Sequence, residues 1–372
     1  MNPRMTSAMT HEPSSYAAVN RTLEIHLYTK YHWSDYNMTF NGSDGSYEDN
    51  ETEPNNVPTV VKALEHYAVP VICFLGIIGD VISLFVFVCT SFRYQPCSQY
   101  LAALAFVDTL FLISKLLLSF MPVVPSMASA PGSCFVIVYI SYVCSFLSAW
   151  FVVLMMTERN IVVCYPFRAS AMCNKKKSIV VILVTTVFAL ILYSHSFFTT
   201  ERNGKVCTID HNYFEFLGIF TYVDSFLVFV VPFLSIVCLN LRIILTVRKF
   251  RLRHDLLNHS IRRTPRYQNS GNTLTLAQVR STKMLIWVSS VYIVLYLPSY
   301  VVRLYGLILV QISLNPDHFY VTQSICQFLY YLNFGIDFIV YVMTSNNFRR
   351  NVARCARTVH MTRAGCKYRY KY

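Results

Sequence analysis

The chain has 372 residues, of which 54% are hydrophobic and only 14% are charged, a composition too apolar for an ordinary soluble domain of this length. The formal net charge of +13 has the sign of a nucleic-acid-binding protein. However, most of the basic residues collect in segments between or after long apolar runs, so we expect no nucleic-acid partner.

Residues 1–65 form a polar segment that lacks cysteine and lacks the apolar core of a signal peptide. The segment contains nine of the 19 acidic residues and four N-x-S/T sequons, at Asn20, Asn37, Asn41 and Asn50. Four sequons in one short polar segment indicate N-glycosylation better than a single sequon does. We therefore predict a disordered, glycosylated, extracellular tail.

Seven predominantly apolar runs follow, at 67–91, 99–121, 134–163, 179–199, 214–241, 284–310 and 319–343. Each run is long enough to cross a hydrocarbon core of about 30 Å. Because a backbone inside a bilayer must satisfy its own hydrogen bonds, each run predicts a helix. The expected fold class is an all-α membrane protein with a seven-transmembrane-helix bundle over residues 66–345.

Basic residues collect on one side of this predicted bundle. They lie at Arg168 and Lys175–Lys177, between the third and fourth runs, at 248–266, between the fifth and sixth runs, and at 349–371, after the seventh. If each run crosses the membrane once, these three segments lie on the same side. The positive-inside rule makes this side cytoplasmic and places the N-terminus outside the cell. We expect a multi-pass protein of the plasma membrane whose basic clusters attract anionic lipid headgroups.

Most of the twelve cysteines lie within the runs or on the cytoplasmic side, where thiols stay reduced. Cys134, at the outer start of the third run, and Cys207, after the fourth, are the extracellular candidates for a disulfide. The alternatives are two unrelated thiols, or a competing bond to Cys326. Cys355 lies among basic residues after the last run, a setting that suits palmitoylation.

Several short motifs occur at fixed places in the runs. They are Leu104-Ala105-Phe106-Val107-Asp108, Glu158-Arg159-Asn160 with Cys134 lying 25 residues before Arg159, Pro232, Pro298, and Asp337-Phe338-Ile339-Val340-Tyr341. In this order and spacing they resemble the motifs of rhodopsin-like (class A) G-protein-coupled receptors. Phe348-Arg349-Arg350 then resembles the start of the family's amphipathic helix, so residues 346–372 are expected to form that helix and a basic tail.

The chain also departs from the family pattern. Asp80 stands where the family has Asn, Tyr296 stands where it usually has Trp, and Phe338 replaces a proline in the seventh run. In having Phe338 in place of this proline, the chain resembles FMRFamide-type neuropeptide receptors.

The resemblance implies a heterotrimeric G protein as the cytoplasmic partner. Arg159 matches the arginine that contacts this partner, and Glu158 beside it would pair with Arg159 at rest, since a buried guanidinium is costly without a partner. Many members of the family have a carboxylate at the position of Gln278. Because Gln278 is not acidic, a contact between the third and sixth helices in the resting receptor would be weak. The other residues implied in activation are Tyr296, Pro298, Asp337 and Tyr341.

An ionisable group inside a membrane is energetically costly, so each such residue is a candidate for a functional site. Toward the outside these groups are Arg303, Lys115 and Asp224, and the resemblance places ligand at their depth together with Tyr142 and Tyr296. Both signs of charge favour a peptide ligand. The alternatives are that Lys115 reaches the surface and that Asp224 only pairs with Arg303.

Deeper in the predicted bundle, Asp108, Ser148, Asn333 and Asp337 resemble the family's sodium pocket. Their oxygen atoms suit a hard cation, so an allosteric sodium ion is expected, and no other cofactor. Nearby carboxylates, including Asp80, would repel one another. The alternative is a hydrogen-bonded polar core without an ion.

Other functions remain open at this point. A chemosensory receptor of the same fold would bind a small non-peptide ligand. A seven-helix transporter or channel would usually show internal repeats and paired broken helices, and the sequence shows no repeat. An enzyme is not expected, because no Gly-rich phosphate loop, H-E-x-x-H motif or nucleophile elbow is present.

Overall fold

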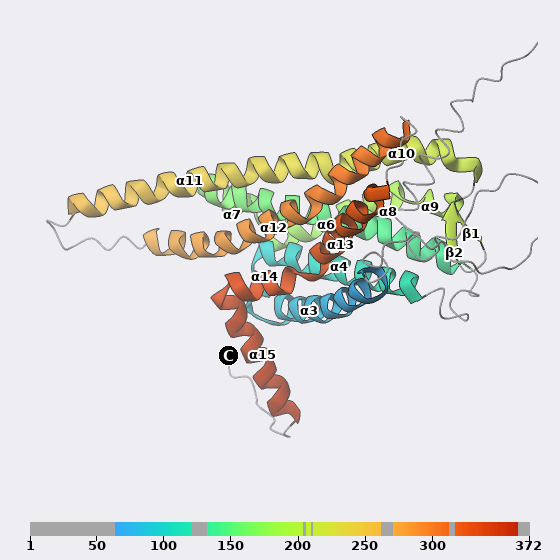
Figure 1. Cartoon of the computed structure of the whole chain (residues 1–372). Coiled ribbons are helices and arrows are strands. Elements are labelled where there is room, and N and C mark those ends of the chain that lie inside the picture. Colours follow the sequence, from blue (N-terminus) through green and yellow to red (C-terminus); the bar gives the residue numbers. More distant parts are fainter. Residues whose placement is uncertain are drawn as a thin grey trace, which may run out of the picture.

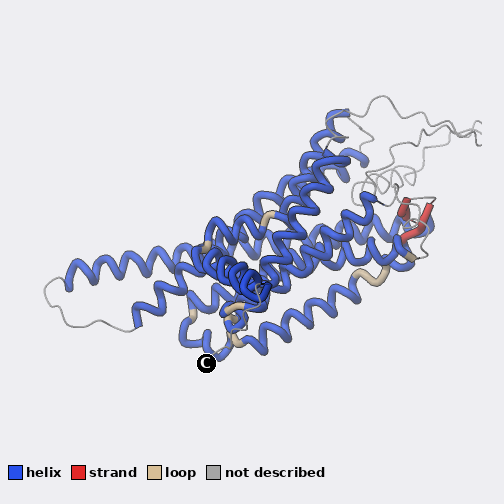
Figure 2. Tube along the Cα trace, turned by 90° about the horizontal axis from the view of Figure 1, so that it is seen from below, coloured by secondary structure: helices blue, strands red, loops and turns tan. Residues whose placement is uncertain are grey.

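A computed structural model describes residues 64–120, 132–203, 206–209, 211–261, 271–311 and 317–363. The predicted glycosylation sites Asn20, Asn37, Asn41 and Asn50 lie outside these residues. Six of the described helices are long and apolar enough to cross a membrane, and a bent pair of helices makes a seventh span. The prediction of a seven-helix bundle is confirmed, with the long helices lying roughly side by side (Figures 1 and 2).

The first half of the bundle contains four spans. A π-helical turn, η1 (Leu64–Ala68), leads into α3 (Val69–Cys89), and a 3₁₀ turn, η2 (Ser91–Tyr94), connects α3 to α4 (Pro96–Phe120). Next come α6 (Ser133–Cys164), the short α7 (Pro166–Met172) and α8 (Lys175–Leu192). Helix α6 stops before Pro166 as expected, because the residue before a proline disfavours helical backbone angles.

An antiparallel hairpin follows α8, and sequence analysis did not predict it. After the short α9 (Ser196–Thr199), strand β1 (Thr200–Asn203) pairs with β2 (Val206–Ile209) in a register that sets Arg202 opposite Cys207. Both strands contact α6, and Cys134 at the start of α6 is disulfide-bonded. Its pairing with Cys207, whose side chain is outside the described part, stays a prediction.

The fifth and sixth spans continue far beyond the apolar runs. After η3 (His211–Tyr213), the fifth span consists of α10 (Phe214–Ser225), a π-helical turn η4 (Phe226–Val230) and α11 (Val231–Ile261). The π turn directly precedes Pro232, which has no N–H for the helical ladder. The sixth span is α12 (Gly271–Gln311), and α11 and α12 together project from one end of the bundle (Figure 1).

The seventh span is bent by 57° between α13 (Asp317–Gly335) and α14 (Asp337–Thr344). No proline is present at the bend. Gly335 instead lies so close to α3 that a Cβ on Gly76 would sit 2.7 Å from the Gly335 Cα, and Phe338 packs against Gly79. The bend is therefore produced by a helix break at glycine and by close backbone packing.

Helix α15 (Asn346–Arg363) leaves the bundle at an angle, at the end opposite the β1–β2 hairpin (Figure 1). Its first turn packs inward, because Phe348 is fully buried against Phe87 and Tyr341. The expected helix after the last span is therefore present. The two ends of the bundle are called the hairpin end and the α15 end below.

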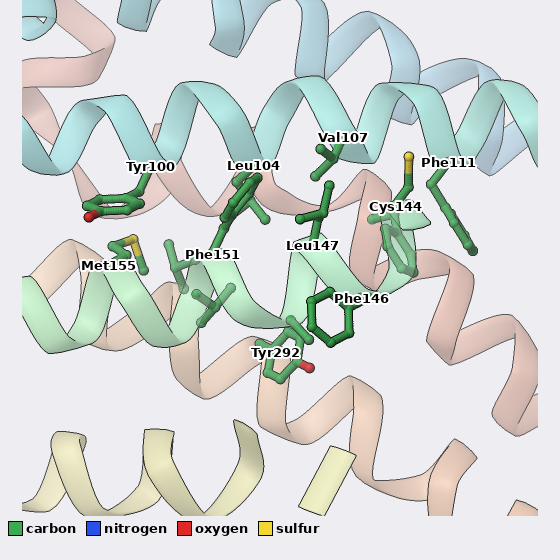
Figure 3. Close-up of a cluster of buried hydrophobic side chains, with 14 of the residues drawn as sticks. Tyr100, Leu104, Val107, Phe111, Cys144, Phe146, Leu147, Phe151, Met155 and Tyr292 are labelled. Atoms are coloured by element: carbon green, nitrogen blue, oxygen red, sulfur yellow. The ribbon is translucent and has the colours of Figure 1, made fainter. Parts of the chain in front are cut away.

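The core is densest between α4 and α6. Figure 3 shows Leu104 and Val107 of α4 facing Leu147 and Phe151 of α6, with Tyr292 of α12 approaching the same layer. Of the most apolar 18 residues of the α6 span, 78% are buried inside the protein, whereas the corresponding share for the α8 span is 17%. Helix α6 is thus the central helix that positions residues at both ends of the bundle.

Candidate functional site

At the α15 end, α6 presents the Glu158-Arg159 pair. The Arg159 Nε donates a hydrogen bond to the Sγ of Cys97 on α4 at 3.2 Å, and the Ser178 hydroxyl on α8 donates to Glu158 Oε2 at 3.3 Å. All four side chains are buried. Among the described side chains, Glu158 and Arg159 do not form the direct ion pair that was expected. Each has a different hydrogen-bond partner, and the two charges still attract each other electrostatically.

A second polar group lies in the middle of the bundle. Asp108 of α4 accepts a hydrogen bond from Ser148 of α6, and the hydroxyl of Tyr341 donates to Asp337 Oδ2 at 3.1 Å. Asn333 is buried one turn before Asp337 on the seventh span. Within the described residues, no group of three or more His, Cys, Asp or Glu side chains is arranged to hold a metal ion.

Asp80 of α3 belongs to this group and interacts electrostatically with Asp108 and Asp337. Its side chain is fully buried, and neither carboxylate oxygen has a hydrogen-bond partner in the described part of the chain. Burying a carboxylate without hydrogen bonds is unfavourable. Asp80 is therefore the least compensated of the buried charges described here.

This environment predicts that Asp80→Asn raises the stability of the protein. The amide keeps the shape of the side chain and removes the repulsion from Asp108 and Asp337. We expect the melting temperature of the detergent-purified protein to rise by roughly 2–4 °C. Asp80→Ala, which leaves a cavity, is the matched control, and a lower melting temperature for Asp80→Asn would show that the carboxylate itself is stabilising.

The hairpin end contains a cluster of five side chains, the hairpin-end cluster: Lys115, Tyr142, Tyr193, Asp224 and Arg303. The Tyr193 hydroxyl donates to Asp224 Oδ1 at 2.5 Å, and the Tyr193 ring stacks on Tyr142 with centroids 5.4 Å apart. Arg303 interacts electrostatically with Asp224, Tyr142 and Lys115. The structure thus brings together the three charged residues that sequence analysis singled out at this level.

The two cations of this cluster lie against aromatic rings. The Lys115 Nζ is 5.4 Å from the ring centroid of Phe111 and 5.5 Å from that of Tyr331, and the Arg303 guanidinium is 5.1 Å from that of Tyr300. Such cation–π contacts stabilise charges that are removed from water. Because Lys115 is only 8% exposed, the alternative in which it reaches the surface is wrong.

A column of tyrosines on α12 runs from the hairpin-end cluster toward the middle of the bundle. Tyr300 stacks on Tyr296 at 5.5 Å, and Tyr296 stacks on Tyr292 at 4.2 Å, with Pro298 inside the same stretch of helix. Tyr330 of α13 packs against Tyr296 at 5.0 Å and exchanges a 2.7 Å hydrogen bond with Ser145 of α6. The column therefore connects the sixth, seventh and third spans.

Of this column, only Tyr296 was predicted from the sequence to be a site residue, and Tyr292 was not. The four-residue spacing of Tyr292, Tyr296 and Tyr300 places them on one face of a helix, and this was visible in the sequence. Tyr193 and Cys97 carried no such signal, because their partners lie 31 and 62 residues away in the chain.

Comparison with known proteins decides the family. The family described as "7 transmembrane receptor (rhodopsin family)" matches residues 79–341, which contain all three groups of polar residues. The chain belongs to the rhodopsin family of seven-transmembrane receptors. The class expected from the motifs is therefore confirmed, and a transporter, channel or enzyme is not favoured for this rhodopsin-family receptor.

Curated relatives of this rhodopsin-family receptor include thyrotropin-releasing hormone receptors. The receptor from Ovis aries is 25% identical over 331 residues, which cover 80% of this chain and 81% of the relative. The receptor from Mus musculus is 25% identical over 341 residues, covering 83% and 84%. The similarity to FMRFamide-type receptors stays a prediction.

Cys355, the palmitoylation candidate of this receptor, is half-buried on α15 and packs against the core of the bundle. Burial raises the pKa of its thiol, so the fraction of reactive thiolate at neutral pH is lower than for a surface cysteine. Palmitoylation at Cys355 stays a prediction.

Proposed function

We propose that this receptor lies in the plasma membrane with its N-terminus outside, binds an extracellular peptide at the hairpin end and activates a heterotrimeric G protein at the α15 end. The observation that carries the proposal is the position of two polar sites on one helix. Tyr142 and Arg159 lie 17 residues apart on α6, which corresponds to roughly 25 Å along the helix axis.

The hairpin-end cluster supports a ligand with charged and polar groups. It contains two cations, Lys115 and Arg303, and one carboxylate, Asp224, that already accepts a short hydrogen bond from Tyr193. A peptide offers backbone carbonyls and acidic groups to such cations and aromatic or amide groups to the surrounding tyrosines. The relatives are named as receptors for thyrotropin-releasing hormone, which makes this hormone one ligand to test.

The tyrosine column supports coupling between the two ends. An agonist that contacts Arg303 or Tyr142 acts next to Tyr300, whose ring stacks on Tyr296 beside Pro298. A proline within a helix provides a bend at which α12 can change shape. Activation then requires only that the agonist binds the active arrangement of α12 more tightly than the resting one.

The test is a G-protein-dissociation assay in cells with confirmed surface expression. The cells are challenged with thyrotropin-releasing hormone and a library of amidated neuropeptides, and cells that express Arg159→Ala serve as the control. A saturable response in the wild-type receptor that is absent in Arg159→Ala supports the proposal. A response only to small non-peptide compounds would contradict the peptide assignment, and a ligand-evoked current without G-protein dissociation would contradict the coupling.

Arg303→Ala should weaken the agonist more than it lowers the maximal response. Arg303 is placed at the hairpin end, far from Arg159, and truncating it removes a ligand contact without touching the coupling site. We expect the concentration for half-maximal response to rise about tenfold or more, since a charged hydrogen bond contributes roughly 1.5–3 kcal/mol. Tyr305→Ala, a half-exposed α12 tyrosine, is the control, and an unchanged curve for Arg303→Ala would remove Arg303 from the ligand site.

Further parts of the proposal concern ions and modifications. Asp108, Ser148, Asn333 and Asp337 supply oxygen ligands that fit a sodium ion, and Asp108 Oδ1 has no hydrogen-bond partner among the described residues. A bound ion would neutralise part of the charge at Asp108. Anionic lipids are proposed to contact the basic face of α15, and Asn20, Asn37, Asn41 and Asn50 to carry glycans.

A further inference from the structure

The immediate surroundings of Arg159 differ from those that the sequence led us to expect. The Nε of its guanidinium donates a hydrogen bond to the thiol sulfur of Cys97, in the first turn of α4. Both side chains are less than 10% exposed. A hydrogen bond that involves a charged group is stronger than a neutral one. The contact therefore holds Arg159 toward the second span of the bundle.

The neighbouring acid is held toward the same side. Glu158 accepts from Ser178 of α8, and it interacts electrostatically with Tyr100, which lies one turn after Cys97 on α4. The thiol of Cys173, between α7 and α8, contacts the backbone carbonyl of Glu158 at 3.9 Å. Among the described side chains, the contacts of this pair thus come from α4, α8 and the segment between α7 and α8.

We propose that Cys97 is a positioning residue that restrains Arg159 in the resting receptor. This inference rests on the proposed role of Arg159 in G-protein coupling. For Arg159 to contact a G protein, its Nε must leave the Cys97 sulfur. Breaking this hydrogen bond adds to the free energy that separates the resting and active states, so Cys97 lowers ligand-independent signalling.

A reactive role for these thiols fits the structure less well. Cys97 is only 2% exposed, and burial raises the pKa of the Cys173 thiol to about 11. A redox sensor needs an accessible thiol with a large thiolate fraction. The geometry of Cys97 fits an acceptor for Arg159 instead.

The test measures G-protein dissociation without ligand, divided by the number of receptors at the cell surface. Cys97→Ala removes the acceptor, and we expect ligand-independent signalling to rise about two- to tenfold, the factor that corresponds to one hydrogen bond. Cys97→Ser keeps an acceptor of similar size and should restore the wild-type level. Cys326→Ala, which truncates a buried free cysteine in the middle of α13, is the matched control and should leave the level unchanged.

A second variant covers the case in which Cys97→Ala does not reach the surface. Cys97→Asp replaces the thiol by a carboxylate, a stronger acceptor for Arg159, and should lower both ligand-independent signalling and agonist potency. Wild-type signalling in Cys97→Ala, equal signalling in the Ala and Ser variants, or higher signalling in Cys97→Asp would overturn the inference. Failure of the proposed coupling is recognised separately, because Arg159→Ala would then keep the agonist response.

Discussion

Arg159→Ala should reduce agonist-evoked G-protein dissociation to the background of untransfected cells while the receptor remains at the surface. Among the described residues, the Arg159 side chain has one hydrogen-bond partner, the Cys97 thiol, and an electrostatic attraction to Glu158. Glu158 keeps its own hydrogen bond from Ser178 after the truncation. The change therefore removes a buried charge whose contacts are few, so the folding cost should be small. Surface abundance by antibody labelling and binding of a labelled agonist measure what remains.

Arg159→Lys separates the charge from the geometry of the guanidinium. Lysine keeps the positive charge but lacks the planar set of N–H donors, so we expect a partial response between those of the wild type and Arg159→Ala. If Arg159→Ala instead disappears from the cell surface, the pair serves the fold and not the coupling. If it signals normally from the surface, Arg159 is not the coupling residue.

Gly76→Leu should prevent assembly of the bundle and remove most receptor from the surface. A Cβ at position 76 would lie 2.6 Å from the Leu112 Cδ1 and 2.7 Å from the Gly335 Cα, and the second of these atoms belongs to backbone that cannot rotate away. Adding atoms to a packed core costs about 1–3 kcal/mol, and a backbone clash at the bend of the seventh span adds to this cost. The measurement is surface abundance together with the melting temperature of the purified receptor.

Val81→Leu is the control for this prediction. It also enlarges a side chain on α3, but Val81 is 49% exposed and faces away from the core. The control should leave surface abundance and melting temperature near the wild-type values. Normal abundance of Gly76→Leu would show that α3 and α13 can separate at this point without loss of the fold.

The apolar runs predicted the spans well because burial in lipid requires long, uninterrupted helices. The parts of α11 and α12 at 251–261 and 271–281 were missed because they are polar and lie beyond the apolar spans, so hydropathy does not indicate that they are helical. The hairpin was missed because two strands of four residues carry too short an alternating pattern to recognise.

Individual charged residues were easier to predict than their partners. Lys115, Asp224 and Arg303 were recognised because charge is costly in a membrane, and the structure does bring them together. Glu158 was expected to pair with Arg159 because of the family resemblance and because a buried guanidinium is costly without a partner. Adjacent residues on a helix point in directions about 100° apart, so contacts from α4 and α8 decide their partners.

The bend of the seventh span also has a mechanical meaning. A proline ring holds one backbone torsion of a kink, φ, covalently at about −65°. In this receptor the joint between α13 and α14 is made by glycine and by the contact of Gly335 with Gly76, without any ring. Its rest angle therefore depends on how α3 and α13 lie against each other. Sliding of these two helices would turn α14, which carries Asp337 and Tyr341, as a lever turns about a pivot.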